Sequence, residues 1–187
     1  TELAKALAEF IFGSAERMFR FDMSEYKEYD SYQKLIGSPH ARDDSALESG
    51  ALLSKVRQQP FCVILLDEIE KAHANAFDLF LQMFDDGRLT DAQGRTADFT
   101  QSIVVMTSNL GSNLQQAEPF GFNQASDQDR LESRVREAME EFFRPEFLNR
   151  IDRIIQFQPL QPEHVRMLAQ RELGQVLLRT GLTRRRV

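Results

Sequence analysis

The chain has 187 residues, 42% of them hydrophobic and 28% charged, which suffices for one globular domain with a buried core. The net charge of −6 argues against a general nucleic-acid-binding function, and no stretch approaches the roughly 18 apolar residues of a membrane span. The single cysteine, Cys62, excludes a disulfide framework and fits a reducing, cytoplasmic location. Because the sequence opens on Thr1 without an initiator methionine, we expect a piece of a longer protein.

Helical and strand patterns alternate along the first half of the chain. Leu3, Leu7 and Ile11 recur at helical spacing beside small alanines, which predicts an amphipathic helix that ends near Gly13. A continuous apolar run at 61–66 predicts a strand that is buried on both faces. The other expected elements are a strand over 19–23, a short helix with turns within 24–37, a charged loop over 38–50, a helix over 51–58 and a helical stripe over 77–84 that breaks at Gly87.

The second half of the chain continues the alternation. A second apolar run at 103–106 predicts another buried strand. Leu131, Val135 and Met139 recur at helical spacing before Pro145. The other expected elements are a hairpin over 88–100 with its turn at Gly94, a loop over 112–128, a strand over 154–157, a linker over 159–162 and a separate helical unit from Val165 onward.

Strands that alternate with helices, two of them apolar throughout, are typical of an α/β fold. Such a fold has a parallel sheet with helices on both sides. Ligands bind to these sheets beyond the carboxyl ends of the strands. The residues that directly follow 61–66 and 103–106 are therefore the candidates for chemistry.

Two carboxylates, Asp67 and Glu68, follow the first apolar run. Carboxylates at the end of a buried strand are costly unless a cation meets them. A nucleotide-bound Mg²⁺ is such a cation, with Asp67 in the metal's coordination shell and Glu68 polarising the water that attacks the γ-phosphate. The alternative is that Asp67 caps the following helix by accepting backbone N–H groups.

Two further polar positions fit a phosphate site. The triplet Thr107-Ser108-Asn109 follows the second apolar run and can orient an attacking water, although an ordinary turn uses the same residue types. Thr1 opens an amphipathic helix, as the last residue of a phosphate-binding loop G-x-x-x-x-G-K-[ST] would. The alternative for Thr1 is a helix N-cap.

Arg150 precedes the last expected strand and has two interpretations. A lone arginine is commonly part of a surface ion pair, here with Asp152 or Glu146. It can also act as a finger that reaches the γ-phosphate bound by a neighbouring subunit. Arg144 is a weaker competitor for that second role.

Six sequence blocks, spread in order over nearly the whole chain, carry a family resemblance. They are TELAKALAE at 1–9, FDMSEY at 21–26, LLDEIEKAH at 65–73, DDGRLTD at 85–91, MTSNLG at 106–111 and RPEFLNRID at 144–152. Together they resemble the second ATPase ring domain of Clp-type AAA+ unfoldases and disaggregases, the ClpB, ClpA, ClpC and ClpV group.

The resemblance implies a particular fold and domain organisation. The fold is a AAA+ P-loop NTPase three-layer α/β sandwich with a mostly parallel sheet. Residues 1–158 would form the large nucleotide-binding subdomain, without the start of its Walker A loop. Residues 159–187 would begin the small helical subdomain, and the sensor-2 arginine of that subdomain is not in this sequence.

The resemblance also implies a role for individual residues. Thr1 corresponds to the Walker A threonine and, with Asp67 of the Walker B motif, would bind the nucleotide and ligate Mg²⁺. Glu68 corresponds to the catalytic glutamate and Asn109 to the sensor-1 residue. Arg150 corresponds to the arginine finger that acts in trans.

The implied activity is that of an Mg²⁺-dependent ATPase in a protein-remodelling motor. The family forms hexameric rings, here a homo-oligomer, that use ATP hydrolysis to pull on a protein or peptide substrate. One departure bears on this activity, because the family's Gly-Tyr-Val-Gly type loop has no aromatic counterpart within 38–50. The alternative function is therefore a nucleotide-dependent assembly or regulatory module that does not thread peptide.

Overall fold

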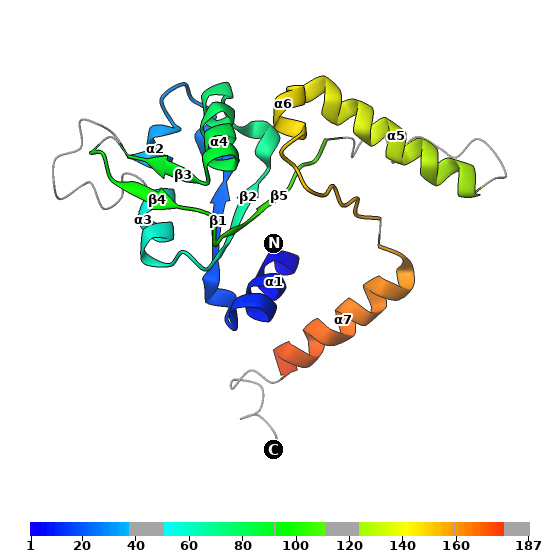
Figure 1. The fold of residues 1–187 in the computed structure, drawn as a ribbon. Coiled ribbons are helices and arrows are strands. Elements are labelled where there is room, and N and C mark those ends of the chain that lie inside the picture. The colour runs from blue at the N-terminus through cyan, green and yellow to red at the C-terminus, as the bar shows by residue number, and fades with distance from the viewer. Residues whose placement is uncertain (38–50, 92, 111–123, 159, 178–187) are drawn as a thin grey trace, which may run out of the picture. The chain divides into compact units, whose positions relative to one another are not determined.

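The computed structural model describes residues 1–37, 51–91, 93–110, 124–158 and 160–177 (Figure 1). The chain divides into two compact units, Thr1–Asp152 and Arg153–Val187, and each is described by itself. The loop expected over 38–50 lies outside the described residues. The domain boundary expected after residue 158 stays a prediction.

Three parallel strands form the sheet of the first unit. They are β1 (Met18–Asp22), β2 (Val63–Asp67) and β5 (Ile103–Met106), in the order β1-β2-β5. Residues 63–66 of the central strand β2 have no exposed surface, which explains why this strand is apolar without interruption. The parallel sheet predicted from the sequence is confirmed.

Helix α1 (Glu2–Phe12) packs on one face of this sheet. Side chains alternate along a strand, and Val63 and Leu65 therefore point to the same face. They contact Ala4 and Ala8 of the helix, which are both buried. These small side chains let the helix backbone lie close to the strands.

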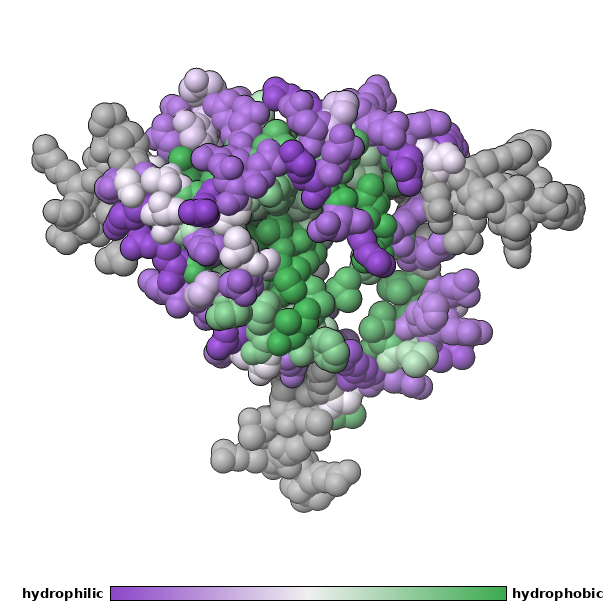
Figure 2. Space-filling view, viewed as in Figure 1, coloured by the Kyte–Doolittle hydropathy of each residue, from purple (hydrophilic) through white to green (hydrophobic). Residues whose placement is uncertain are grey.

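The outer side of α1 is apolar and exposed. Leu3, Phe10 and Ile11 are 55%, 88% and 47% exposed, and Figure 2 shows apolar side chains gathered over this helix. The spacing of Leu3 and Ile11 predicted that they face the core. The buried face of the helix instead centres on Ala4 and Ala8, each of which lies next to one of the leucines in the sequence. Gly13 ends α1 as predicted, with a left-handed φ of 78°.

The opposite face of the sheet carries the larger core. Ile64 and Leu66 of β2 lie there together with apolar residues of helices α3 (Ala51–Gln58) and α4 (Ala74–Asp86). Both helices were predicted, α3 over 51–58 and α4 from its apolar stripe over 77–84, and Gly87 ends α4 with a φ of 62°. Helices therefore cover both faces of the sheet, and the predicted α/β fold is confirmed.

Short elements connect the strands and helices of this unit. His73 acts as the N-cap of α4, since its Nδ1 accepts a hydrogen bond from the N–H of Asn75 at 3.2 Å. Cys62 is a buried free thiol whose pKa is raised by burial. The short elements are η1 (Ala15–Arg17), η2 (Met23–Tyr26), α2 (Gln33–Ile36), η3 (Ile69–Lys71) and α6 (Pro145–Leu148). The remaining helix of the unit, α5 (Gln124–Phe142), is long.

A β-hairpin follows α4, as the sequence predicts. Its strands are β3 (Arg88–Thr90) and β4 (Thr96–Asp98), which pair antiparallel. Gly94 lies in the turn with a φ of 79°, a conformation that favours glycine. Glycine therefore suits this position of the turn between the two strands.

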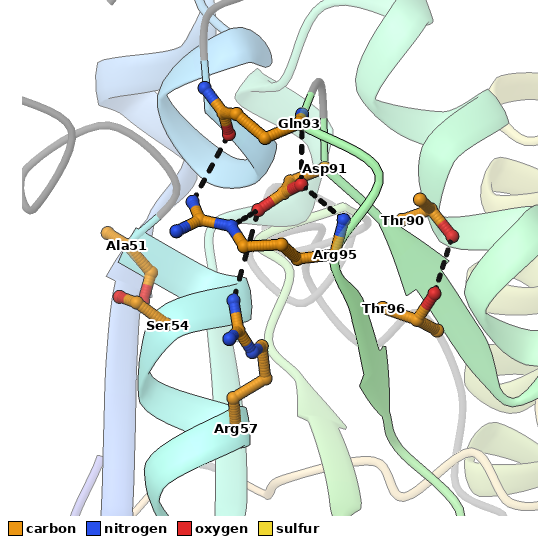
Figure 3. A network of polar contacts seen from close by, with 8 residues as sticks. All are labelled: Ala51, Ser54, Arg57, Thr90, Asp91, Gln93, Arg95 and Thr96. Atoms are coloured by element: carbon orange, nitrogen blue, oxygen red, sulfur yellow. Dashed lines mark hydrogen bonds and ion pairs between the residues drawn. The ribbon is translucent and has the colours of Figure 1, made fainter. Parts of the chain in front are cut away.

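A buried carboxylate holds this turn together (Figure 3). The Asp91 side chain is only 3% exposed, and its Oδ1 accepts hydrogen bonds from the N–H groups of Gln93 at 3.0 Å and Arg95 at 2.7 Å. Its Oδ2 accepts from Arg95 Nε at 2.6 Å and lies 3.9 Å from Nη1 of Arg57 on α3. Burial raises the pKa of Asp91, but the hydrogen bonds from Arg95 and Gln93 outweigh it and bring the pKa below its ordinary value of 3.8.

We expect Asp91→Asn to loosen the hairpin at neutral pH. Replacing a charged acceptor of three hydrogen bonds costs about 1–3 kcal/mol, which corresponds to amide exchange in the hairpin that is about 5- to 160-fold faster. Hydrogen–deuterium exchange of the full-length protein measures this difference. Asp98→Asn, at an exposed carboxylate of the same hairpin, is the control and has the smaller effect.

The pH dependence of this effect follows from the lowered pKa of Asp91. A carboxylate whose pKa is lower in the folded state stabilises the fold above its unfolded pKa and loses that contribution as the pH falls through the folded value. The difference between parent and Asp91→Asn therefore shrinks as the pH falls below 3.8. A difference that grows on acidification would contradict this account.

Three expectations from the sequence are wrong. Strand β5 is partly exposed, because β2 is its one strand partner within the described ranges. Residues 124–128, expected in the loop over 112–128, belong to α5, while 111–123 lie outside the described residues. Residues 154–157, expected as a strand, have no regular structure and lie without a pairing strand in the part of the chain that is described.

The second unit contains helix α7 (Pro162–Leu177). The helical unit predicted from Val165 onward is present, but it begins at Pro162, inside the linker expected over 159–162, because proline is favoured in the first turn of a helix. Ile154, Ile155 and Phe157 precede it and are 52%, 69% and 68% exposed. In neither unit does a described helix have the length and apolar character needed to cross a bilayer.

Candidate active site

Two neighbouring strands end in polar residues at the same edge of the sheet. Strand β2 ends at Asp67, and β5 is followed by Thr107, Ser108 and Asn109. The two strands are parallel and adjacent, so their carboxyl ends lie side by side. This is the edge at which the sequence predicts chemistry.

The Asp67 carboxylate is held by side chains from both neighbouring strands. Its Oδ2 accepts hydrogen bonds from Nε of Arg20 at 2.8 Å, and Nη2 of the same guanidinium lies 2.6 Å away. Its Oδ1 accepts a hydrogen bond from the hydroxyl of Thr107. The side chain is 14% exposed, and Arg20 balances its charge. These contacts do not match the capping alternative, in which backbone N–H groups would bind the carboxylate.

Glu68 has a left-handed backbone, which is uncommon for a residue with a side chain. Its φ is 56° and its ψ is 52°, a conformation that costs roughly 1–2 kcal/mol. The turn directs its carboxylate toward Asn109, whose Nδ2 donates to Glu68 Oε1 at 3.2 Å. The structure therefore brings together two of the residues predicted to be catalytic.

Backbone hydrogen bonds fix the two polar segments to each other. The N–H of Thr107 donates to the carbonyl of Leu66 at 3.0 Å, and the N–H of Ile69 donates to the carbonyl of Thr107 at 3.0 Å. Glu70 Oε1 accepts from the N–H of Asn109 at 3.1 Å. The segment after β5 is thus attached to the segment after β2 on both sides of Glu68.

Thr1 lies at the N-cap of α1, where the sequence predicts it. Its carbonyl accepts the N–H of Lys5 at 3.2 Å, but its hydroxyl makes no capping hydrogen bond to the helix. Within the described residues, no hydrogen bond or ion pair joins Thr1 to Asp67. The predicted role of its hydroxyl at the metal therefore stays a prediction.

An aromatic cluster positions α6 against α4. Phe147 of α6 lies 5.2 Å from Phe77 and 5.8 Å from Phe84, between ring centroids, and it stacks on Phe143 at 5.3 Å. Phe143 and Phe147 are buried. This packing fixes the turn after α6, and the position of Arg150 follows from it.

Arg150 pairs with an acid that is distant in the sequence. Its Nε lies 2.5 Å from Oδ1 of Asp85 at the end of α4, and its N–H donates to the carbonyl of Phe147. The sequence suggested Asp152 or Glu146 as its partner. Among the described residues, Arg150 forms an ion pair with neither of them. Half of the Arg150 side chain is exposed, and among the described residues no hydrogen bond or ion pair joins it to Asp67 or Glu68.

Three residues of the site were not predicted from the sequence. Arg20 meets the requirement for a cation near Asp67, but it comes from a different strand and only the register places it there. Thr107 was noticed only as part of a polar triplet. Glu70 lies two residues after Glu68, and its Oε2 is buried without a hydrogen-bond partner among the described residues. The strand-end rule alone does not identify such supporting residues.

A parallel sheet between helices, with an acidic pair facing an amide at the strand ends, defines the class as an α/β domain whose ligand site lies at the carboxyl ends of the strands. The model of the family described as AAA domain (Cdc48 subfamily) matches residues 1–154. The chain belongs to this AAA+ family, and the resemblance noted from its sequence blocks is confirmed.

Individual relatives agree with this assignment. The ATP-dependent Clp protease ATP-binding subunit ClpA homolog of Porphyra purpurea is 48% identical over 186 residues, covering 96% of this chain and 22% of that protein. The chaperone protein ClpB of Leptolyngbya boryana is 53% identical over 169 residues, covering 89% and 19%. The structure of the S. cerevisiae Hsp104:casein complex has a TM-score of 0.79 and 37% identity, covering 96% of this chain and 30% of that one. The chain spans about a fifth of the length of these two curated relatives.

Proposed function

We propose that this chain is the ATP-hydrolysing part of a ring-shaped protein-remodelling motor, an unfoldase or disaggregase of the cytoplasm. The observation that carries the proposal is the hydrogen bond between the Glu68 carboxylate and the Asn109 amide. A carboxylate and an amide at the ends of adjacent strands can hold one water between them and orient it for attack. Membership of the AAA+ family supports ATP as the substrate.

The residues at the strand ends have different roles in the proposed reaction. Glu68 accepts the proton of the attacking water, and Asn109 orients that water by donating from its amide. Asp67 and Thr1 supply a carboxylate and a hydroxyl, the oxygen ligands that Mg²⁺ prefers, so they would hold the metal together with the nucleotide phosphates. Bound Mg²⁺ would neutralise the charge that develops on the phosphates.

We further propose that Arg150 acts across a subunit boundary of a homo-hexameric ring. Its guanidinium is half exposed and lies at the end of α6, so a bound nucleotide of a neighbouring subunit can approach it. The observed ion pair with Asp85 is the resting position of the side chain in this proposal. An exposed ion pair of this kind is worth at most about 1 kcal/mol and is easily exchanged.

The proposed substrate of the motor is an unfolded polypeptide. A similar solved structure is named as a complex of Hsp104 with casein, which supports a protein substrate for this chain as well. The alternative, an assembly or regulatory module that does not thread peptide, rests on the missing aromatic within 38–50. That segment lies outside the described residues.

ATP turnover in the presence of an unfolded polypeptide separates these two functions. For a motor, we expect the full-length protein to hydrolyse ATP several-fold faster when a permanently unfolded polypeptide is added. A stably folded, crosslinked protein of similar length is the control and leaves the rate unchanged. The regulatory module would be favoured if the rings assemble in an ATP-dependent manner and neither polypeptide changes the rate of ATP hydrolysis.

A further inference from the structure

One hydroxyl, that of Thr107, contacts both members of the acidic pair. The backbone N–H of Glu68 donates to Thr107 Oγ1 at 3.1 Å, and Thr107 Oγ1 donates to Oδ1 of Asp67. A backbone N–H can only donate, so the hydroxyl accepts from Glu68 and its single proton is left for Asp67. The direction of both hydrogen bonds is therefore fixed by the donor at Glu68.

The backbone of Thr107 strengthens the same connection. Its N–H and carbonyl bind Leu66 and Ile69, the residues on either side of the acidic pair. Thr107 is thus hydrogen-bonded to four consecutive residues, 66–69, which include the acidic pair. Glu68, in the middle, has the left-handed backbone with a φ of 56°. A strained residue persists only where its surroundings hold it, and Thr107 supplies the contact to its N–H.

We propose that Thr107 is a positioning residue for ATP hydrolysis, whose hydroxyl holds Glu68 in its left-handed conformation and fixes the orientation of the Asp67 carboxylate. The inference rests on the proposed function, because it assigns Thr107 a role through Glu68 and Asp67. Thr107 does not itself contact the reacting atoms. Its hydroxyl sets the angle at which the Glu68 carboxylate meets Asn109 and the attacking water.

The test removes the hydroxyl and keeps the shape of the side chain. In the full-length, assembled protein, we expect Thr107→Val to lower kcat for ATP about 10- to 100-fold, the usual effect of losing a supporting hydrogen bond at a metal or catalytic site. Binding of a fluorescent ATP analogue in the presence of Mg²⁺ should change less than the kcat does. Thr107→Ser keeps the hydroxyl, and we expect its kcat within about threefold of the parent.

A matched control removes a similar hydrogen bond far from the acidic pair in the sequence. Thr100 Oγ1 donates to Asp98 Oδ1 at 2.7 Å on the exposed hairpin, so Thr100→Val also deletes a threonine-to-aspartate hydrogen bond. We expect parental kcat for this variant. In a Glu68→Gln background, adding Thr107→Val should cause no further loss, because both changes act on the same step.

The outcomes distinguish this inference from the proposed function. Parental kcat in Thr107→Val, or a Thr107→Ser variant as slow as Thr107→Val, would overturn the role of the hydroxyl while Glu68→Gln stays inactive. Parental turnover in Glu68→Gln would overturn the role of Glu68 and this inference with it, whereas a parent protein that does not hydrolyse ATP would overturn the proposed function. If Thr107→Val does not assemble, Thr107→Ala is judged against Thr107→Ser by the same criterion.

Discussion

Glu68→Gln keeps ATP binding and lowers the rate of ATP hydrolysis by at least about 100-fold in the full-length protein. The change is isosteric, so the hydrogen bond from Asn109 to the side-chain oxygen is retained. What is lost is the ability to accept the proton of the attacking water, and a positioned general base contributes about 10²- to 10⁴-fold. Steady-state turnover and the affinity for a fluorescent ATP analogue are the two measurements.

The neighbouring acid Glu70 provides the control for charge. Glu70→Gln also removes one negative charge, two residues away from Glu68. The Glu70 side chain accepts a hydrogen bond from the backbone N–H of Asn109, whereas Glu68 accepts one from the Asn109 side chain. We expect a smaller loss of turnover than in Glu68→Gln, because the supporting hydrogen bond can be kept by an amide oxygen. Parental turnover in Glu68→Gln would show that another group activates the water.

Arg150→Ala abolishes ATP hydrolysis and leaves nucleotide binding intact. An arginine finger contributes about 10³- to 10⁵-fold to turnover, whereas its exposed ion pair with Asp85 adds at most about 1 kcal/mol to stability. The variant should therefore fold and assemble normally, which thermal melting and sizing check. Arg144→Ala is the matched control, since Arg144 is similarly exposed and pairs with Asp78 at 3.1 Å. A comparable loss in Arg144→Ala would transfer the role to that arginine.

Mixed rings test whether Arg150 acts in trans. Neither Arg150→Ala nor Glu68→Gln rings hydrolyse ATP alone in this proposal. At a boundary between the two variants, the Arg150→Ala subunit keeps its Glu68 and receives Arg150 from the Glu68→Gln neighbour. Mixing therefore restores part of the turnover, with a maximum at intermediate ratios. Absence of any recovery at every ratio would argue that Arg150 acts within its own subunit or has no catalytic role.

Local rules were sufficient to predict most of the fold and part of the candidate site. Glycines at 13 and 87 end their helices because a left-handed residue is required there, and this is visible in the sequence. The proximity of Glu68 and Asn109 followed from the rule that parallel strands end at one edge. The helix ends depend on residues close in sequence, whereas the proximity of Glu68 and Asn109 depends on the shared direction of two adjacent strands.

The features that could not be predicted depend on contacts between distant segments. The Arg20–Asp67 pair needs the register of two strands, and the Arg150–Asp85 pair needs the aromatic packing of α6 on α4. The start of α5 at Gln124 precedes its apolar stripe, so periodicity alone does not reveal it. The apolar residues at 154–157 resemble a strand, but a strand forms only where a partner pairs with it.

The guanidinium of Arg20 balances the charge of the carboxylates beside it. It lies 2.6 Å from Asp67 and 3.8 Å from Asp22, between two carboxylates of adjacent strands. The protein thus carries its own counter-ion for the carboxylate that we propose as a metal ligand. We therefore expect the charge of Asp67 to stay balanced by Arg20 when nucleotide and metal leave the proposed site, so that this carboxylate keeps its position.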